Sequence, residues 1–206
     1  MPSLTFIPPA LPQQRDHPPD GPLWRHELKH DGWRLQILKD GSDITLLSKN
    51  GHDLTRRFRT VADAARALKA RRLVLDGELI AYGEDGLPSF AALRGPAKDT
   101  RHCVWAFDLL QRGKTDLTGQ IWRRRRATLA RVLPPPVREA AWFELSEDFE
   151  NGETLLAAAE AMGLEGIVSK RLDAPYVSGP GCGWIKVKTD AWRIANRARF
   201  KQFSRG

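Results

Sequence analysis

The stretch 27-ELKHDGWR-34 places four charged residues around a glycine: Glu27, Lys29, Asp31 and Arg34. If the chain is extended here, side chains two positions apart share one face of a strand. Glu27, Lys29 and Asp31 would then point the same way, while Leu28 points into the core. Lysines and carboxylates gathered on one surface can hold a phosphorylated ligand and a divalent ion.

Two later strands that the sequence predicts repeat this spacing of charged residues. They carry Asp76 with Glu78, and Trp184 with Lys186 and Lys188. A solvated strand face would explain each group by itself, but three such faces on one sheet would form a concave binding surface. Glycines next to the charges allow a ligand or another backbone to approach closely; they are Gly32, Gly77 and Gly166. The phosphate-binding pattern GxxxxGK[ST] is absent from the sequence.

These residues must be positioned by the strands and helices around them. The order of those elements along the sequence predicts an α+β fold with mainly antiparallel sheets flanked by helices. Hairpins mix with helices, without the strict alternation of a parallel sheet. We expect a hairpin over 33–51 around Asp40-Gly41, strands at 73–82, 102–110, 141–145, 165–171 and 183–188, and helices at 60–70, 89–94, 121–133 and 152–163. Residues 1–22 hold half of the 14 prolines and are expected to be an extended lead-in.

Composition limits the classes of function. The chain has 206 residues and a formal net charge of +8, which favours a polyanionic partner such as nucleic acid, although a merely soluble basic protein fits equally well. Only two cysteines occur, and they do not form a CxxC pair, which argues against a structural zinc site and suits a reducing cytosol. We find neither a membrane-spanning apolar run nor a secretion signal, so no membrane partner is expected.

Five motifs in a fixed order carry a resemblance to a known family. They are 29-KHDGWR-34, 76-DGEL-79, 107-FDLL-110, 165-EGIVSK-170 and 184-WIKVK-188. This set resembles the nucleotidyltransferase motifs of ATP-dependent DNA ligases, and most of all the ligase domain of bacterial end-joining ligases. RNA ligases and messenger-RNA capping enzymes share the superfamily, but their motifs match less well. The resemblance implies a nucleotidyltransferase (ATP-grasp-like) adenylation domain.

The resemblance also implies a mechanism. Lys29 would attack the α-phosphate of ATP, release pyrophosphate and form a lysyl-AMP intermediate, and Lys186 and Lys188 would bind the α-phosphate. An isolated lysine has a pKa of about 10.4, so nearby cations and partial burial would have to lower the pKa of Lys29. AMP would then pass to a DNA 5′-phosphate, and attack by a 3′-hydroxyl would seal the nick.

The remaining roles follow from the same resemblance. Glu27 would accept a hydrogen bond from the adenine amino group, and Phe107 would stack on the adenine ring. Arg34 would contact the ribose or steer the nicked strand. Glu78 would contact the ribose, and Glu78 and Glu165 would help to hold Mg²⁺ or Mn²⁺. Asp31 and Gly32 would shape the turn beside Lys29, whereas Asp76 and Asp108 are at least as well explained as structural hydrogen-bonding groups.

The expected partner is nicked or broken double-stranded DNA, which requires a basic surface. Candidates are Arg56, Arg57, Arg59, the run Arg123–Arg126 and the tail 192–206, which has five basic residues and no acidic ones. For the four-arginine run, a solvated helix face is an equally good explanation. At 48-SKNG-51 the family often has arginine in the second place; Lys49 keeps the charge but not the bidentate fork.

We predict three segments: a Pro-rich extended segment at 1–22, an adenylation domain at 23–190 and a basic tail at 191–206. Ligases of this type normally continue into an OB-fold domain, and the residues after Lys188 are too few for one. We expect a natural stand-alone domain in the bacterial cytosol or nucleoid, rather than a shortened chain. An OB-fold or end-joining repair protein could then act in trans. The alternatives are a catalytically weak, ligase-derived module that binds DNA or nucleotide, and an RNA ligase or capping-type enzyme.

Overall fold

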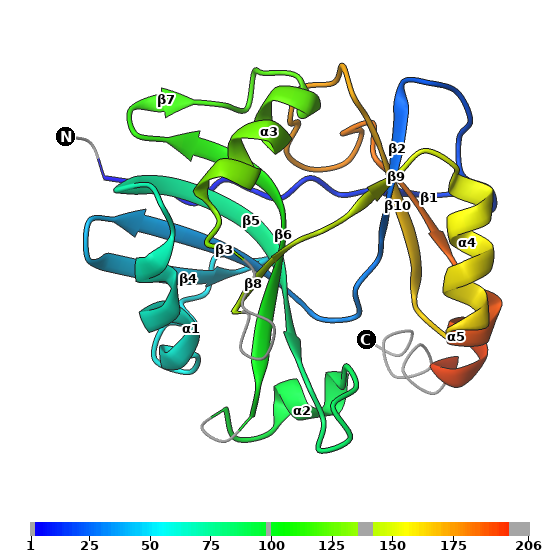
Figure 1. Ribbon diagram of the computed structural model, residues 1–206, viewed down its shortest axis with the longest axis horizontal. Helices are drawn as coiled ribbons and strands as arrows, with labels where there is room; N and C mark the ends of the chain where they lie inside the picture. The colour runs from blue at the N-terminus through cyan, green and yellow to red at the C-terminus, as the bar shows by residue number, and fades with distance from the viewer. Residues whose placement is uncertain (1–2, 98–99, 136–141, 198–206) are drawn as a thin grey trace.

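Two β-sheets packed against each other form the body of the domain (Figure 1). The computed structural model describes residues 3–97, 100–135 and 142–197. Neighbouring strands are antiparallel except for the pairs β1–β11 and β6–β8. The predicted α+β class with mainly antiparallel sheets is therefore confirmed. Among the described residues, no helix is both long and apolar enough to cross a membrane.

The large sheet has the strand order β4-β3-β5-β6-β7, and β8 pairs with the other part of β6. Its strands are β3 (Trp33–Asp40), β4 (Asp43–Ser48), β5 (Arg72–Ala81), β6 (His102–Arg112), β7 (Thr115–Asp116) and β8 (Phe143–Leu145). The predicted hairpin is confirmed, because Asp40 pairs with Asp43 and Gly41 makes the turn with a φ of 63°. Such a positive φ favours glycine.

The small sheet has the strand order β1-β11-β10-β2-β9. Its strands are β1 (Gln13–Gln14), β2 (Trp24–Leu28), β9 (Asp148–Phe149), β10 (Gly166–Arg171) and β11 (Ile185–Lys188). The register places Glu27 beside Val168, and Val168 beside Lys186. Three segments distant in sequence thus present side chains on one face of this sheet.

Short helices cover the outer faces of the sheets. They are α1 (Arg59–Ala64) continued by the 3₁₀ turn η1 (Ala65–Ala67), α2 (Phe90–Arg94), α3 (Trp122–Val132), α4 (Gly152–Ala161) and α5 (Asp190–Ala195). Three of them begin at side chains that accept a hydrogen bond from the first turn, namely Ser89, Asn151 and Thr189. Helix α4 packs against β10 and β2, and α5 contacts α4 (Figure 1).

The apolar interior has three parts. The largest lies under the large sheet and includes Leu35, Leu75 and Leu109, which are fully buried. A small cluster packs α4 onto the small sheet through Leu155 and Ile167. The remaining cluster joins the two sheets, because it combines residues of both; its buried members are Ala10, Leu38, Val74, Phe107, Leu110, Tyr176, Cys182 and Trp184.

Residues 7–15, which we name the N-terminal strap, run between the two sheets. Ile7 exchanges two hydrogen bonds of 2.9 Å with the side chain of Gln36 in β3. Further along, the Gln13 and Arg15 amides donate to carbonyls of the β11 region, at 2.9 and 3.0 Å. The strap thus contacts the large sheet near one end and the small sheet near the other.

Candidate active site

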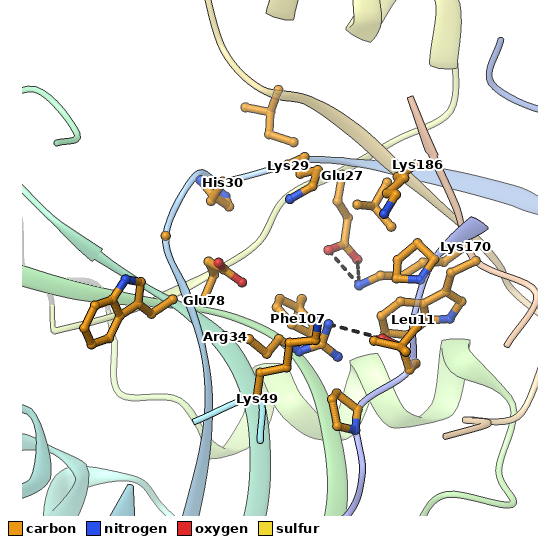
Figure 2. A pocket seen from close by; sticks show the side chains of 18 of the residues that line it. Leu11, Glu27, Lys29, His30, Arg34, Lys49, Glu78, Phe107, Lys170 and Lys186 are labelled. Carbon is orange, nitrogen blue, oxygen red and sulfur yellow. Dashed lines mark hydrogen bonds and ion pairs between the residues drawn. The ribbon is translucent and has the colours of Figure 1, made fainter. Parts of the chain in front are cut away.

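The candidate site is a pocket of about 420 Å³ between the two sheets (Figure 2). This volume is within the range of small-molecule sites. The expectation that three charged faces share one sheet is wrong, since β2 and β11 belong to the small sheet and β5 to the large one. The pocket is lined by Pro9, Ala10, Leu11, Pro12, Glu27, Leu28, Lys29, His30, Gly32, Trp33, Arg34, Ser48, Lys49, Glu78, Phe107, Val168, Lys170, Trp184 and Lys186.

Three lysines and one carboxylate form a charged cluster, of which Lys29 and Lys186 line the pocket. Glu165 is buried, and its two oxygens each lie 2.9 Å from a lysine Nζ, one of Lys29 and one of Lys188. Lys186 lines the pocket, and its pKa is lowered by burial and by the positive charges of Lys29 and Lys188. Three of the predicted residues, Glu165, Lys186 and Lys188, are therefore brought together around Lys29, the proposed nucleophile.

Lys29 follows directly after β2, and a glycine fixes its backbone. The Lys29 amide donates to the Gly166 carbonyl at 2.8 Å, which extends the pairing of β2 and β10 by one residue. Gly166 has a φ of 142°, and a Cβ there would lie 1.9 Å from the Val187 carbonyl oxygen. Only glycine fits this position, so Gly166 allows β10 and β11 to approach closely beside Lys29.

The large sheet contributes a second carboxylate. Glu78 faces the pocket from β5, and burial raises its pKa to about 7, although Lys29 and Arg34 oppose this shift. A carboxylate with such a raised pKa binds a proton more readily than a carboxylate in water does. Next to it, a Cβ on Gly32 would lie 2.3 Å from the Leu79 carbonyl oxygen. Gly32 therefore lets the loop after Lys29 lie directly against β5.

Arg34 is held rigidly beside the pocket. Its guanidinium makes a bidentate pair with the buried carboxylate of Asp76, at 2.7 and 2.6 Å, and lies 4.6 Å from the centre of the Phe107 ring. The Tyr176 hydroxyl donates to the same carboxylate at 2.9 Å. These contacts support the structural role expected for Asp76. Arg34 keeps further N–H donors that could reach a ligand.

A buried ion pair also lies in the pocket, close to two aromatic rings. Lys170 Nζ donates to both oxygens of Glu27 at 2.9 Å, and lies 4.5 Å from the centre of the Phe107 ring and 4.3 Å from that of Trp184 (Figure 2). Burial raises the pKa of Glu27 and lowers that of Lys170, while the mutual attraction opposes both shifts. Phe107 and Glu27 thus lie together, as a base-binding end requires.

Sequence reasoning gave no role to several residues of the pocket. Lys170 lies within a quoted motif, and strand alternation puts it on the same face as Val168. That signal could have identified it. His30 stacks on Trp105 with ring centres 4.4 Å apart, and burial and the charge of Lys29 lower its pKa to about 4. Nothing in the local pattern indicates that the strap lines this pocket.

Asp31 is not among the residues that line the pocket. Strand β2 ends at Leu28, so the alternation that would place Asp31 beside Glu27 and Lys29 does not continue. Its carboxylate instead accepts a hydrogen bond of 3.2 Å from the indole of Trp192 in α5. Lys188 Nζ lies 4.1 Å from the centre of the same indole ring. Part of the predicted basic tail thus forms a helix against the domain.

A second groove, lined by four exposed arginines, adjoins the pocket. They are Arg56, Arg57, Arg59 and Arg94. Arg57 also stacks over Trp33, with its guanidinium carbon 4.9 Å from the ring centre, and Trp33 lines the nucleotide-sized pocket. One arginine of the groove therefore contacts an aromatic side chain that lines the pocket. Three of these arginines were predicted as DNA contacts, and Arg94 was not.

The four-arginine run is divided between two environments. Arg125 is fully buried in a bidentate pair with Asp108, at 2.8 and 2.9 Å, so neither is open to a ligand. Arg126 is buried against Asp148 and Ser146. The expectation that the whole run forms a DNA surface is wrong for these two, because distant carboxylates draw them inward; Arg123 and Arg124 are exposed. Residues 198–206 of the predicted basic tail lie outside the described residues.

The donor set for a metal ion is small. Within the residues that the structure describes, no group of three or more His, Cys, Asp or Glu side chains could hold one. Glu78 and Glu165 are the carboxylates of the pocket region that were predicted for this role. Magnesium commonly binds one or two protein carboxylates together with substrate phosphates. The residues therefore fit a metal that arrives with a nucleotide, but not a cage made by the protein alone.

The fold and the pocket together define the class: this is the nucleotidyltransferase fold of ATP-dependent ligase adenylation domains. The structure superposes on mycobacterial DNA ligase D complexed with ATP and MES, with a TM-score of 0.71 and 29% identity, over 87% of this chain and 59% of that one. The ligase domain of Mycobacterium tuberculosis LigD gives a TM-score of 0.75 and 29% identity, over 87% and 60%.

The chain belongs to the family described as the ATP dependent DNA ligase domain, whose model matches residues 19–188. The multifunctional non-homologous end joining protein LigD of Pseudomonas aeruginosa is 37% identical over 194 residues. That match covers 91% of this chain and 22% of LigD. A probable DNA ligase of Streptomyces avermitilis is 37% identical over 79% of this chain and 34% of its own length. The chain thus spans about a fifth to a third of these relatives.

Proposed function

We propose that this domain takes AMP from ATP onto Lys29 and passes it to a DNA 5′-phosphate during the sealing of nicks or breaks. The observation that carries the proposal is the cluster of lysines around Glu165: Lys29, which lines the pocket, and Lys188 both lie 2.9 Å from its carboxylate. Family membership and the relatives named as end-joining ligases support the DNA substrate. RNA nicks serve as the comparison substrate.

In the first step, the Lys29 amine attacks the α-phosphorus of ATP. The N–P bond forms, the bond to the bridging oxygen breaks, and pyrophosphate leaves with the electron pair. The amine must lose a proton, and Glu165 lies within hydrogen-bonding distance to accept it. Lys186 and Lys188 would stabilise the charge that develops on the α-phosphate oxygens.

The base end of the pocket would hold adenine. Phe107 offers a ring for stacking, and the Glu27 carboxylate retains acceptor capacity for the adenine amino group besides its two bonds to Lys170. Arg34 and Glu78 both line the pocket and would contact the ribose. Mg²⁺ or Mn²⁺, when bound through Glu78 or Glu165 and the nucleotide, would neutralise phosphate charge.

The DNA backbone would follow the arginine groove. Its four exposed arginines can pair with phosphates, and one of them, Arg57, stacks on Trp33, which lines the pocket. Lys49 lines the pocket and would contact phosphate as a point charge. We propose that an OB-fold or end-joining repair protein in trans completes the DNA-encircling surface, and that the protein works in the bacterial cytosol or nucleoid.

A labelling experiment tests the proposal. The protein should become covalently labelled by ATP with a radioactive α-phosphate, in the presence of Mg²⁺ or Mn²⁺, and not by ATP labelled at the γ-phosphate. A nicked DNA duplex with a pre-adenylated 5′ end, compared with the same duplex carrying an RNA strand, then tests the later step. Absence of any label from α-phosphate, with and without DNA, would exclude the adenylating function.

A further inference from the structure

The N-terminal strap is bonded to the parts of the protein that carry the two halves of the pocket. On the large sheet, the Ile7 amide and carbonyl bind the Gln36 side chain. On the small sheet, the Gln13 and Arg15 amides donate to the carbonyls of Trp184 and Lys186. Residues between these anchors, from Pro9 to Pro12, line the pocket. The strap therefore spans the cleft rather than lying on one side of it.

The middle of the strap is hydrogen-bonded to Arg34 and to Tyr176, which binds the Asp76 partner of Arg34. Ala10 is completely buried; its amide donates to the Tyr176 hydroxyl at 2.9 Å, and its carbonyl accepts from Arg34 Nη1 at 3.4 Å. Tyr176 in turn donates to Asp76, which binds Arg34. These contacts close a ring of hydrogen bonds, so the position of Ala10 and that of the Arg34 guanidinium depend on each other.

The strap is also fixed along its length. Leu11 donates to the Gly179 carbonyl, and the Gly179 amide donates to the Pro9 carbonyl, both at 2.9 Å. Pro9 and Pro12 restrict the backbone on either side of Ala10, which reduces the entropy lost when the strap is ordered. The apolar side chains of Leu4 and Ile7 pack on the cluster that joins the two sheets. Such a segment can hold the sheets at a set separation.

We propose that the strap is a positioning element of the nucleotide site, which sets the separation of the two sheets and the orientation of Arg34 and thereby the affinity for ATP. This inference rests on the proposed adenylation by Lys29. A nucleotide that bridges Phe107 and Arg34 on the large sheet and Lys186 on the small sheet requires the two sheets to lie at a fixed separation. The strap supplies neither the nucleophile nor the α-phosphate ligands, so its loosening weakens binding more than it slows the chemical step.

Two conservative variants of the full chain test the proposal. Gln36→Leu removes both bonds to Ile7 without touching the pocket, and Tyr176→Phe removes the hydroxyl that binds Ala10 and Asp76. We expect the ATP concentration for half-maximal labelling to rise about fivefold to tenfold in each, as the loss of one or two hydrogen bonds implies. The labelling rate at saturating ATP should stay within about twofold.

Matched controls remove the same groups elsewhere. Gln111→Leu deletes a side-chain bond to the Gly113 carbonyl at the far end of β6, and Tyr82→Phe changes the other tyrosine of the chain. Both should keep wild-type ATP dependence. The proposal is overturned if Gln36→Leu and Tyr176→Phe match these controls, or if only their saturated rate falls. If the wild type itself does not label, the proposed function fails instead.

Hydrogen–deuterium exchange of the wild type gives an answer even if a variant does not fold. An ATP analogue with a methylene group between the α- and β-phosphates can bind but cannot transfer AMP. Its addition should slow exchange of the Leu11, Gln13 and Arg15 amides, while amides of the β6–β7 turn at Gly113 stay unchanged. Unchanged exchange in the strap, with slowed exchange in β10 and β11, would contradict the proposal.

Discussion

Two kinds of buried ion pair occur in this domain, and they differ in the cation. Two arginine pairs bind carboxylates of the large sheet bidentately, Arg34–Asp76 and Arg125–Asp108. The lysine pairs lie on the small-sheet side of the pocket. Lys170 pairs with Glu27, and Lys29 and Lys188 both pair with Glu165. Arginine stays charged and presents a rigid fork, whereas a buried lysine changes its protonation readily.

The difference separates positioning from chemistry. A guanidinium cannot release its proton under working conditions, so the arginine pairs hold Asp76 and Asp108 in a single arrangement. A lysine can become a neutral amine and attack phosphorus, and the lysine pairs line or border the pocket where this would happen. We therefore expect loss of the Arg125–Asp108 pair to act on stability, and changes to the lysine pairs of Glu165 to act on AMP transfer.

The largest effect is expected at the most buried arginine pair. Arg125→Ala leaves the buried Asp108 carboxylate without its bidentate partner, and should lower the free energy of unfolding by about 3–5 kcal/mol. Urea unfolding at pH 7 measures this change. The exposed neighbour Arg124→Ala should change the free energy of unfolding by less than about 0.5 kcal/mol. Equal effects in the two variants would show that the buried pair has no special structural role.

The next effect is expected at the carboxylate shared by two lysines. Glu165→Gln keeps the shape of the side chain but removes its charge, and should slow α-phosphate labelling about a hundredfold, as loss of a general base does. Its free energy of unfolding should fall by only about 1 kcal/mol, because both lysines remain partly exposed to water. Glu153→Gln, an exposed change in α4, is the control. A labelling rate within twofold of wild type would remove Glu165 from the mechanism.

A smaller effect concerns pH. The pKa of Glu78 in the folded protein is about 7, above its usual value of 4.5, because of burial. The folded protein therefore holds this proton more tightly than the unfolded chain, and the resulting stabilisation, complete below pH 4.5, is lost as pH rises through 7. From pH 5 to 8, wild type should lose roughly 2–3 kcal/mol of unfolding free energy relative to Glu78→Gln. Parallel pH profiles of the two proteins, measured by urea unfolding, would contradict this; Glu84→Gln should follow wild type.

The smallest effect is expected in the arginine groove. In a Lys29→Ala background, Arg94→Ala should weaken binding to nicked duplex severalfold and reduce the salt dependence of affinity by about one phosphate contact. Fluorescence anisotropy at several salt concentrations measures both quantities. Arg131→Ala, an exposed change at the end of α3, should leave them unaltered. Equal losses in the two variants would mean that the groove is not the DNA path.

The sequence predicts the parts of this molecule that depend on local patterns. The Asp40-Gly41 hairpin, the strand carrying Asp76 and Glu78 and the alternation of Lys186 with Lys188 are all found, because strand period and turn chemistry act over a few residues. The same alternation correctly groups Glu27 with Lys29, and stops being valid at Asp31, where the strand has ended.

Contacts between distant segments could not be predicted in this way. The buried environment of Arg125 depends on Asp108, and the strap depends on a hydroxyl 166 residues away in sequence. The way the two sheets face each other likewise depends on the packing of Phe107 against Trp184, whose ring centres lie 6.2 Å apart. A run of charges or prolines does not identify partners that are distant in the sequence. The burial of the arginines and the pocket contacts of the strap can therefore be found only in the three-dimensional structure.

The most direct test of the account is to locate the AMP adduct on the chain. Wild-type protein incubated with ATP and Mg²⁺ is digested under conditions that preserve the phosphorus–nitrogen bond, and the peptides are analysed by mass spectrometry. We predict one peptide heavier by a single adenylyl group, with the modification on Lys29, and no adduct in Lys29→Arg, which keeps the positive charge but cannot supply a neutral amine. An adduct on Lys170, Lys186 or Lys188 in place of Lys29, or an undiminished yield in Lys29→Arg, would contradict the central claim.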